Sequence, residues 1–176
     1  MTFSEMTART AELLEKDVTD TGFADAVKHA LNVAYMTLAR DKFRPVTTET
    51  MTVINGRIPI TMFSEAFLAL KSVHARGGIR VSAWEGHNFV YVTEGFGEVT
   101  VTYYYLPTPM KEDEDEPMFS PAQIDPYAYI YFAAATYLNI KHKHADAAVW
   151  DERYRGIVEN IKEVRSSFQL PAKRWS

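Results

Sequence analysis

The spacing of apolar residues changes twice along the chain and divides the sequence into three segments. In residues 21–40 the apolar positions recur at helical intervals, which predicts a helix with one buried face. Asp20 or Thr21 is predicted to cap the start of this helix, and Pro45 follows its end. A shorter helix is predicted over residues 7–16. The apolar face of the longer helix comprises Phe23, Val27, Ala30, Leu31, Ala34 and Leu38.

The second segment alternates apolar and polar residues, as half-buried β-strands do. Asn55-Gly56 is a pair preferred in two-residue type I′ turns, so a β-hairpin is predicted around it. The pairs predicted for this hairpin are Val53 with Ile58 and Met51 with Ile60. Further strands are predicted over residues 68–74, 79–85, 89–93 and 98–105. In the last strand one face comprises Val99, Val101, Tyr103 and Tyr105. The segment is therefore predicted to form a small antiparallel sheet or barrel.

Helical spacing returns in the third segment. Residues 123–142 predict an apolar helix rich in Tyr and Ala, and residues 145–168 predict a second helix. A short polar link at residues 141–144 makes the two an antiparallel helical hairpin. The apolar positions of the second helix are Trp150, Tyr154, Ile157, Ile161, Val164 and Phe168.

The order of helices, then strands, then helices predicts the fold class. The helices at the two ends of the chain have apolar faces that can cover one another. We therefore predict an α+β fold, in which a small helical bundle built from the N- and C-terminal helices carries an inserted antiparallel β module. The predicted units are a helical bundle of residues 1–45 and 117–168, a sheet or barrel of residues 46–110, an acidic linker of residues 111–116 and a C-terminal tail of residues 169–176.

The distribution of charge indicates two candidate contact regions. The chain of 176 residues has a net charge of −4, and residues 111–116 alone hold one basic and five acidic residues, so the remainder is neutral. Beyond Glu163 the sequence contains Arg165, Lys173 and Arg174 and no acidic residue. An acidic linker and a basic tail on a neutral body predict contacts at two different places. A solvated loop and a frayed terminus are the alternative.

Several classes of function are disfavoured by what the sequence lacks. It contains no cysteine, which excludes disulfides, thiol catalysis and thiolate zinc sites. Its longest apolar run, residues 127–138, is shorter than the roughly 20 residues that a bilayer requires. The first residues do not form a signal-peptide pattern, so we expect folding in a cytosol. Neither a phosphate-binding glycine loop nor a nucleophile elbow is present, and we predict no enzymatic activity and no cofactor.

Three clusters suggest binding chemistry but lack the spacing that it requires. His142, His144 and Asp146 offer metal ligands, yet the two histidines would point in roughly opposite directions on a helix, and lysines flank them. The acidic run lacks the glycine and the distal glutamate of a calcium loop. Residues 103–105 are tyrosines on one strand, and alternation separates Tyr104 from the others, unlike a base-stacking platform. We therefore predict a polar turn, a charged linker, and aromatic residues of a core or an interface.

Residues 99–110 (Val-Thr-Val-Thr-Tyr-Tyr-Tyr-Leu-Pro-Thr-Pro-Met), the acidic run and Pro117-Met-Phe-Ser-Pro together resemble the head–tail adaptor (connector) proteins of tailed phages. The layout is similar too: an N-terminal helix, a β module that ends in an aromatic strand, an acidic linker and two C-terminal helices. The resemblance covers nearly the whole length and is strongest over residues 99–154. It lies in patterning and not in catalytic residues.

The resemblance implies a structural virion protein that forms a ring, dodecameric in most such adaptors, below the portal and around the DNA channel. The implied partners are the portal protein, a stopper, tail-completion or tail-tube protein, and other copies of the chain. Double-stranded DNA would pass without sequence-specific binding, and no membrane is involved. The implied location is the virion neck, after assembly in the host cytoplasm. The C-terminal residues that match a portal-binding role are Phe168, Leu170, Lys173, Arg174 and Trp175.

The acidic linker also gains a hypothesis from this resemblance. Carboxylates that face a DNA channel repel phosphates, so the linker is expected to face the lumen or a partner ring. The residues concerned are Glu112, Asp113, Glu114, Asp115 and Glu116. A plain solvated loop is the alternative. Two other functions remain open, namely another phage neck protein such as a stopper or tail-completion protein, and an unrelated ligand-binding module or enzyme.

Overall fold

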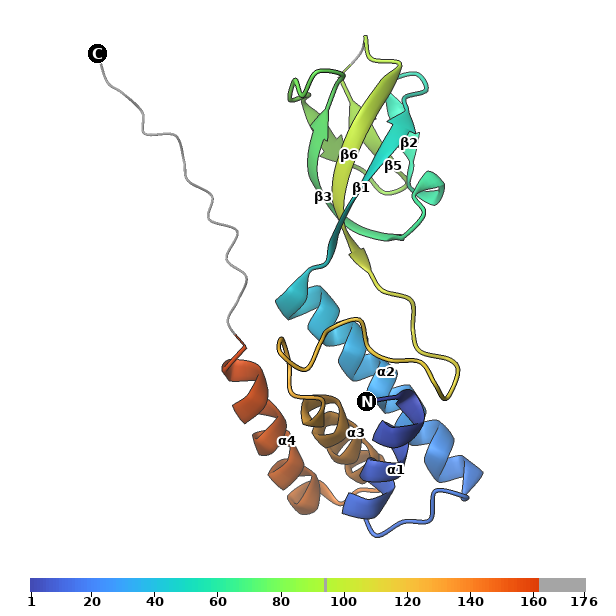
Figure 1. The fold of residues 1–176 in the computed structure, drawn as a ribbon, viewed down its shortest axis with the longest axis vertical. Helices are drawn as coiled ribbons and strands as arrows, with labels where there is room; N and C mark the ends of the chain where they lie inside the picture. The colour runs from blue at the N-terminus through green and yellow to red at the C-terminus, as the bar shows by residue number, and fades with distance from the viewer. Residues whose placement is uncertain (94, 162–176) are drawn as a thin grey trace, which may run out of the picture.

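The computed structural model describes residues 1–93 and 95–161. A helical body lies at one end of the molecule and a β module at the other (Figure 1). The chain enters and leaves the β module along neighbouring strands, so that the helical body is built from both ends of the sequence. The α+β fold with an inserted β module, predicted from the changes in apolar spacing, is confirmed.

Helix α1 spans Phe3–Leu13 and begins four residues earlier than predicted. Thr2 and Glu5 form a reciprocal capping box that fixes this start. The Glu5 amide donates to Thr2 Oγ1 at 3.2 Å, and the Thr2 amide donates to the Glu5 carboxylate at 2.8 Å. The side chains that α1 buries include Phe3, Met6 and Ala11.

Helix α2 spans Thr21–Leu38 and carries the predicted apolar face, on which all six side chains are at most 2 % exposed. Asp20 caps the helix, because its carboxylate accepts hydrogen bonds from two amides of the first turn at 3.0 and 3.3 Å. The chain continues as a π-helical turn, Ala39–Phe43. It then leaves the helical path at Arg44, whose φ is 44°, directly before Pro45.

Helices α3 (Tyr127–Ile140) and α4 (His144–Glu159) form the predicted helical hairpin. Helix α3 begins four residues later than predicted, where the Asp125 carboxylate accepts a hydrogen bond from the Tyr127 amide at 3.0 Å. The final part of the second predicted helix, from residue 162 onwards, lies outside the described residues.

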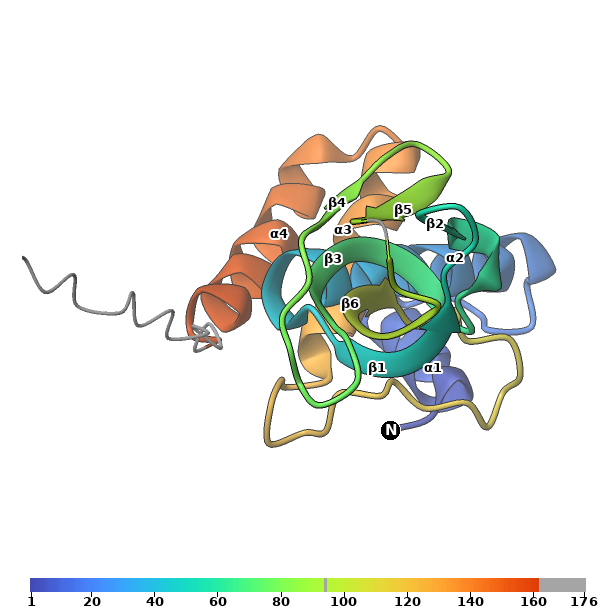
Figure 2. The ribbon, with the colours of Figure 1, turned by 90° about the horizontal axis from the view of Figure 1, so that it is seen from above.

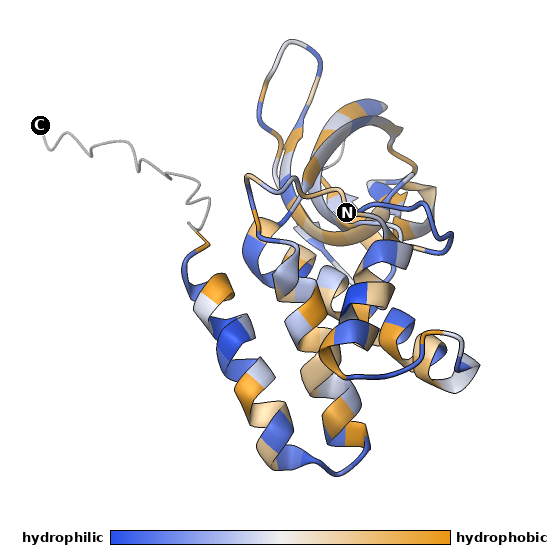
Figure 3. Ribbon diagram, turned by 60° about the horizontal axis from the view of Figure 1, so that its bottom comes forward, coloured by the Kyte–Doolittle hydropathy of each residue, from blue (hydrophilic) through white to orange (hydrophobic). Residues whose placement is uncertain are grey.

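One core joins the helices from the two ends of the chain. Phe23 of α2 packs edge-to-face against Tyr137 of α3, with ring centroids 4.9 Å apart. Helix α4 adds partly buried side chains to this core, whereas much of its surface is hydrophilic (Figure 3). These side chains are Tyr154, Ile157 and Val158, followed by Ile161 just beyond the helix. The shared core is the arrangement that the apolar faces predicted.

The hydroxyl group of Tyr129 is buried in this core and has no hydrogen-bond partner among the described residues. Replacing Tyr129 with Phe is therefore expected to raise the free energy of unfolding by about 1 kcal/mol, because the unpaired polar group is removed. Tyr35 lies beside it, and its hydroxyl accepts a hydrogen bond from the Met118 amide at 3.3 Å. Tyr35→Phe is thus a matched control that should lower stability. Urea denaturation measures both effects, and a destabilised Tyr129→Phe variant would contradict this expectation.

The β module consists of two three-stranded antiparallel sheets. Their strand orders are β1–β6–β3 and β2–β5–β4. The strands are β1 Val46–Thr52, β2 Arg57–Pro59, β3 Ala66–His74, β4 Ala83–Glu85, β5 Phe89–Val92 and β6 Glu98–Leu106. Seen from above, β1, β3 and β6 curl around the centre of the module (Figure 2). Side chains of both sheets form a second core, distinct from the core of the helical body.

The prediction for the Asn55-Gly56 hairpin is right about the turn and wrong about the pairing. Asn55 and Gly56 have φ values of 51° and 71°, and the residues on either side exchange hydrogen bonds at 2.9 and 3.0 Å. Beyond this bridge the strands separate, because β6 offers β1 a partner over its full seven residues and β2 is only three residues long. The predicted pairs were Val53 with Ile58 and Met51 with Ile60, whereas Met51 pairs with Val99 and Ile58 pairs with Val90.

Two of the other predicted strands illustrate what alternation does and does not predict. On the predicted face of β6, Val99, Val101 and Tyr103 are buried to 1 % exposure or less, and Tyr105 is half-buried against the same core. Strand β4 is shorter than predicted, because the preceding residues make only one isolated bridge to β3, between His74 and Arg80.

Where the β module meets the helical body, the two connecting segments lie side by side. The Tyr105 amide donates to the Pro45 carbonyl at 3.0 Å, and Val46 pairs with Tyr104. Because entry and exit are adjacent, the module projects from the body through one narrow connection (Figure 1).

Candidate interaction surfaces

The residues that the resemblance implies for portal binding lie outside the described residues: Phe168, Leu170, Lys173, Arg174 and Trp175. The described part of the chain does contain the acidic linker, both ends of the helical body and the outer faces of the β module.

The acidic linker is fastened to the N-terminal end of α1. The amides of Phe3 and Ser4 donate to the carbonyls of Asp115 and Asp113 at 2.7 and 3.0 Å. These amides belong to the first turn of the helix, which lacks internal partners for them and favours nearby negative charge. The Asp113 carboxylate also pairs with Lys28 of α2 at 2.6 Å. The backbone of the linker is therefore held in place on the body.

The five acidic side chains of the linker differ in their partners. Asp115 accepts hydrogen bonds from the amides of Lys111 and Glu112 at 2.6 and 2.9 Å, and these bonds lower the pKa of its carboxyl group. The Glu116 carboxylate lies 3.2 Å from the Met1 amino group. In the part of the chain that the structure describes, Glu112 and Glu114 are exposed and form no ion pair. These two carboxylates are the ones that the linker presents outward.

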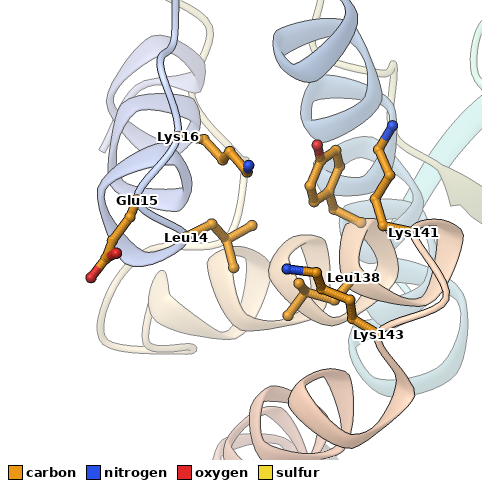
Figure 4. Close-up of a pocket in the computed structure, with 7 residues that line it drawn as sticks. Leu14, Glu15, Lys16, Leu138, Lys141 and Lys143 are labelled. Atoms are coloured by element: carbon orange, nitrogen blue, oxygen red, sulfur yellow. The ribbon is translucent and has the colours of Figure 1, made fainter.

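A groove lies at the opposite end of the helical body, where α1 and α3 both end. It has a volume of about 630 Å³ and is lined by Leu14, Glu15, Lys16, Tyr137, Leu138, Lys141 and Lys143. Figure 4 shows Leu14 and Leu138 facing each other and the Glu15 carboxylate pointing away from the lysines. We call this surface the lysine groove. Its apolar floor and three ammonium groups suit a ligand that combines negative charge with apolar contact.

Two helix endings of the same type place the lysines there. Helix α1 turns at Glu15 (φ 51°), and the Lys16 amide donates back to Ala11 at 2.9 Å. Helix α3 turns at His142 (φ 59°), and the Lys143 amide donates back to Leu138 at 2.9 Å. Both are Schellman motifs, with a residue other than glycine in the left-handed position. Lys16 and Lys141 also lie at the C-terminal ends of α1 and α3, where positive charge is favourable, whereas Lys143 is the N-cap of α4.

An exposed aromatic row crosses the second sheet of the β module. Trp84, Tyr91 and Arg57 occupy paired positions on β4, β5 and β2. The Trp84 and Tyr91 rings stack at 5.5 Å with an interplanar angle of 9°, and the Arg57 guanidinium lies 5.6 Å from the Tyr91 ring. Gly86 permits this stack, because a Cβ atom there would lie 2.5 Å from the Tyr91 ring. Trp84 is 57 % exposed, so the row is open to a partner.

Glu49, Ser64 and Tyr103 form a hydrogen-bonded network at one side of the module core. The Ser64 hydroxyl donates to the Glu49 carboxylate at 2.5 Å, and the buried Tyr103 hydroxyl donates to the same carboxylate. Burial, together with the neighbouring carboxylate, raises the pKa of Tyr103 to about 12. Partial burial alone would raise the pKa of Glu49, but the hydrogen bonds from Ser64 and Tyr103 outweigh it and lower that pKa. The network ties β1 and β6 to the segment that precedes β3.

This network makes the stability of the β module depend on pH. Because the folded-state pKa of Glu49 lies below its usual value of 4.5, its contribution is fully present above that pH and is lost as the pH falls through the folded-state pKa. We expect the unfolding midpoint of the module to fall on acidification below about pH 4.5. Glu49→Gln should flatten this part of the pH profile, which thermal unfolding at a series of pH values measures. Identical profiles for the two proteins would rule out the role of Glu49.

The histidine pair and the tyrosines singled out in the sequence can now be placed in the structure. The rings of His142 and His144 are 6.1 Å apart, and His144 Nδ1 lies 3.0 Å from the Asn139 side-chain oxygen. Within residues 1–93 and 95–161, no group of three or more His, Cys, Asp or Glu side chains is arranged to hold a metal ion. Tyr103 is buried among Phe63 and Phe67 and does not form an exposed platform. No helix in the same described ranges is both long and apolar enough to cross a membrane.

The lysine groove and the aromatic row were not predicted from the sequence. The groove depends on two helix endings that lack the usual glycine, and the row joins three strands whose pairing the predicted hairpin had wrong. The only local signal was the Lys-His-Lys-His link, which was interpreted as a polar turn.

No protein-family model matches the chain, and no curated protein matches it.

Proposed function

We propose that this chain is a structural head–tail adaptor of a tailed phage, which forms a ring below the portal and joins the head to the tail. The observation that carries the proposal is the architecture. Helices from both ends of the chain form one body with a shared core, and the strands form a projection from it (Figure 1). A body of this kind can repeat around an axis, while the projection extends toward a neighbouring ring.

The sequence resemblance supports the same function. The resemblance rests on three sequence features. The aromatic strand is β6, the prolines lie where the chain leaves the β module, and the acidic linker is the segment fastened to α1. The surfaces described above also suit an assembly protein, since they combine exposed aromatic and charged groups. The expected partners are the portal protein above the ring, a stopper, tail-completion or tail-tube protein below it, and DNA passing through.

Binding to the portal protein of the same phage tests this proposal. The resemblance implies that the C-terminal segment binds the portal. Leu170→Ala combined with Trp175→Ala should therefore weaken binding by about tenfold or more, as expected when side chains that anchor an interface are lost. Ile79→Ala is the matched control, because it removes an exposed apolar side chain (64 % exposed) from the β module. Co-sedimentation with the portal measures both variants. Absence of binding by the unaltered chain would overturn the proposal.

A second candidate is another phage neck protein, such as a stopper. The exposed aromatic row on the β module favours keeping this candidate, because it offers a second surface for a protein partner. The two functions differ in the partner retained: an adaptor binds the portal directly, whereas a stopper binds only the adaptor ring or the tail.

A further inference from the structure

The lysine groove and the acidic linker have complementary charges and lie at opposite ends of one helix. Lys16, Lys141 and Lys143 form no ion pair within the described residues, and neither do Glu112 and Glu114. All five side chains are exposed. The chain therefore displays a basic surface with an apolar floor and, elsewhere, two outward-facing carboxylates.

The acidic linker cannot occupy the lysine groove of its own chain. Helix α1 has 11 residues, so its ends are about 16 Å apart at 1.5 Å per residue. The linker is fastened by hydrogen bonds to Phe3 and Ser4 at the N-terminal end, whereas the groove begins at Leu14, beyond the C-terminal end. A contact between the two surfaces must therefore join two molecules.

We propose that the lysine groove of one copy binds the acidic linker of a second copy. In this contact Glu112 and Glu114 face the three lysines, and the backbone of the linker and the methylene groups of its side chains lie over the apolar floor formed by Leu14 and Leu138. Covering that floor removes water from around the charges, which strengthens their attraction. The inference rests on the proposed function, since it names the contact through which the ring would form.

The geometry of this contact is head-to-tail. Each copy uses two different surfaces, so every molecule can bind one neighbour through its groove and another through its linker. Such a contact closes into a ring when the rotation between neighbours divides a full turn, and a two-fold dimer with two reciprocal groove–linker contacts is the smallest such case. The groove and the linker would thus be occupied all around a closed ring.

Charge reversal provides the sharpest test. One variant carries Lys141→Glu and Lys143→Glu, and the other carries Glu112→Lys and Glu114→Lys. In either variant alone, groove positions 141 and 143 and linker positions 112 and 114 carry the same sign of charge, so self-association should weaken by about tenfold or more. In an equal mixture, each groove meets a linker of opposite charge, and association should recover. Sedimentation velocity measures assembly, and circular dichroism checks that both variants are folded.

Two results would overturn the inference: assembly of either variant alone at the level of the unaltered chain, or failure of the mixture to recover. Unaltered assembly combined with a defect in DNA passage would place the carboxylates in the DNA channel. The three lysines would then make no contact with a second copy of the chain. In any of these cases portal binding by the unaltered chain would still support the adaptor function, whereas its absence would remove that function independently.

Disulfide trapping locates the contact without changing the sign of any charge. Because the chain has no cysteine, Lys143→Cys and Glu114→Cys each introduce a single thiol. Mixing the two variants should give a cross-linked heterodimer much faster than either variant cross-links with itself. The control pairs Glu114→Cys with Glu159→Cys, at the far end of the 16-residue helix α4 and so about 24 Å from its start. Equal rates for the two mixtures would contradict the proposed contact.

Discussion

Replacing Phe23 with alanine is expected to lower the free energy of unfolding of the helical body by about 3–5 kcal/mol. Phe23 is 2 % exposed, and its ring packs edge-to-face on Tyr137 at 4.9 Å. The truncation therefore leaves a cavity where an N-terminal helix meets a C-terminal helix. Urea denaturation followed by far-ultraviolet circular dichroism measures the loss.

Val18→Ala is the control for this experiment. Val18 precedes α2 and is 44 % exposed, so its truncation should change stability by less than about 0.5 kcal/mol. A Phe23→Ala variant as stable as the control would mean that α2 and α3 do not share a core, which would contradict a single body built from both ends of the chain.

The second large effect is expected in the β module, where Tyr103→Ala should cost about 3–5 kcal/mol. Tyr103 is 0 % exposed, and its ring lies 4.7 Å from that of Phe63 and 5.6 Å from that of Phe67. Its hydroxyl also bonds to Glu49, so truncation leaves that carboxylate without one of its partners. Tyr103→Phe keeps the ring and should lose only about 1–2 kcal/mol.

The location of the damage is as informative as its size. Because the module core and the helical core are distinct, hydrogen exchange should accelerate in β1, β3 and β6 of Tyr103→Ala, while α2 and α3 keep most of their protection. Equal loss of protection in both parts would show that they unfold as one unit.

The helices could be predicted from the sequence because their signals are local. The apolar face of α2 and its Asp20 cap depend only on residues close together in the sequence. The Thr2–Glu5 capping box, likewise local, indicates the earlier start of α1. The strand order could not be predicted in the same way. The Asn55-Gly56 turn is local, but whether the strands on either side continue to pair depends on β6, which lies more than 40 residues away.

The candidate surfaces were harder to predict for a related reason. The left-handed position of a Schellman motif is usually occupied by glycine, which makes the motif recognisable in a sequence. Here Glu15 and His142 occupy that position. The position of Lys16 beside Lys143 follows only from the packing of α1 against α3. Charge counting identified the acidic linker but gave no indication that Asp113 and Asp115 serve the fold while Glu112 and Glu114 face outward.

Electron microscopy of the purified chain mixed with the portal protein that the proposal names as its partner tests the proposed function most directly. We expect a ring of this chain, coaxial with the portal and continuing its channel. Bare portal rings beside unassembled chain would contradict the adaptor function.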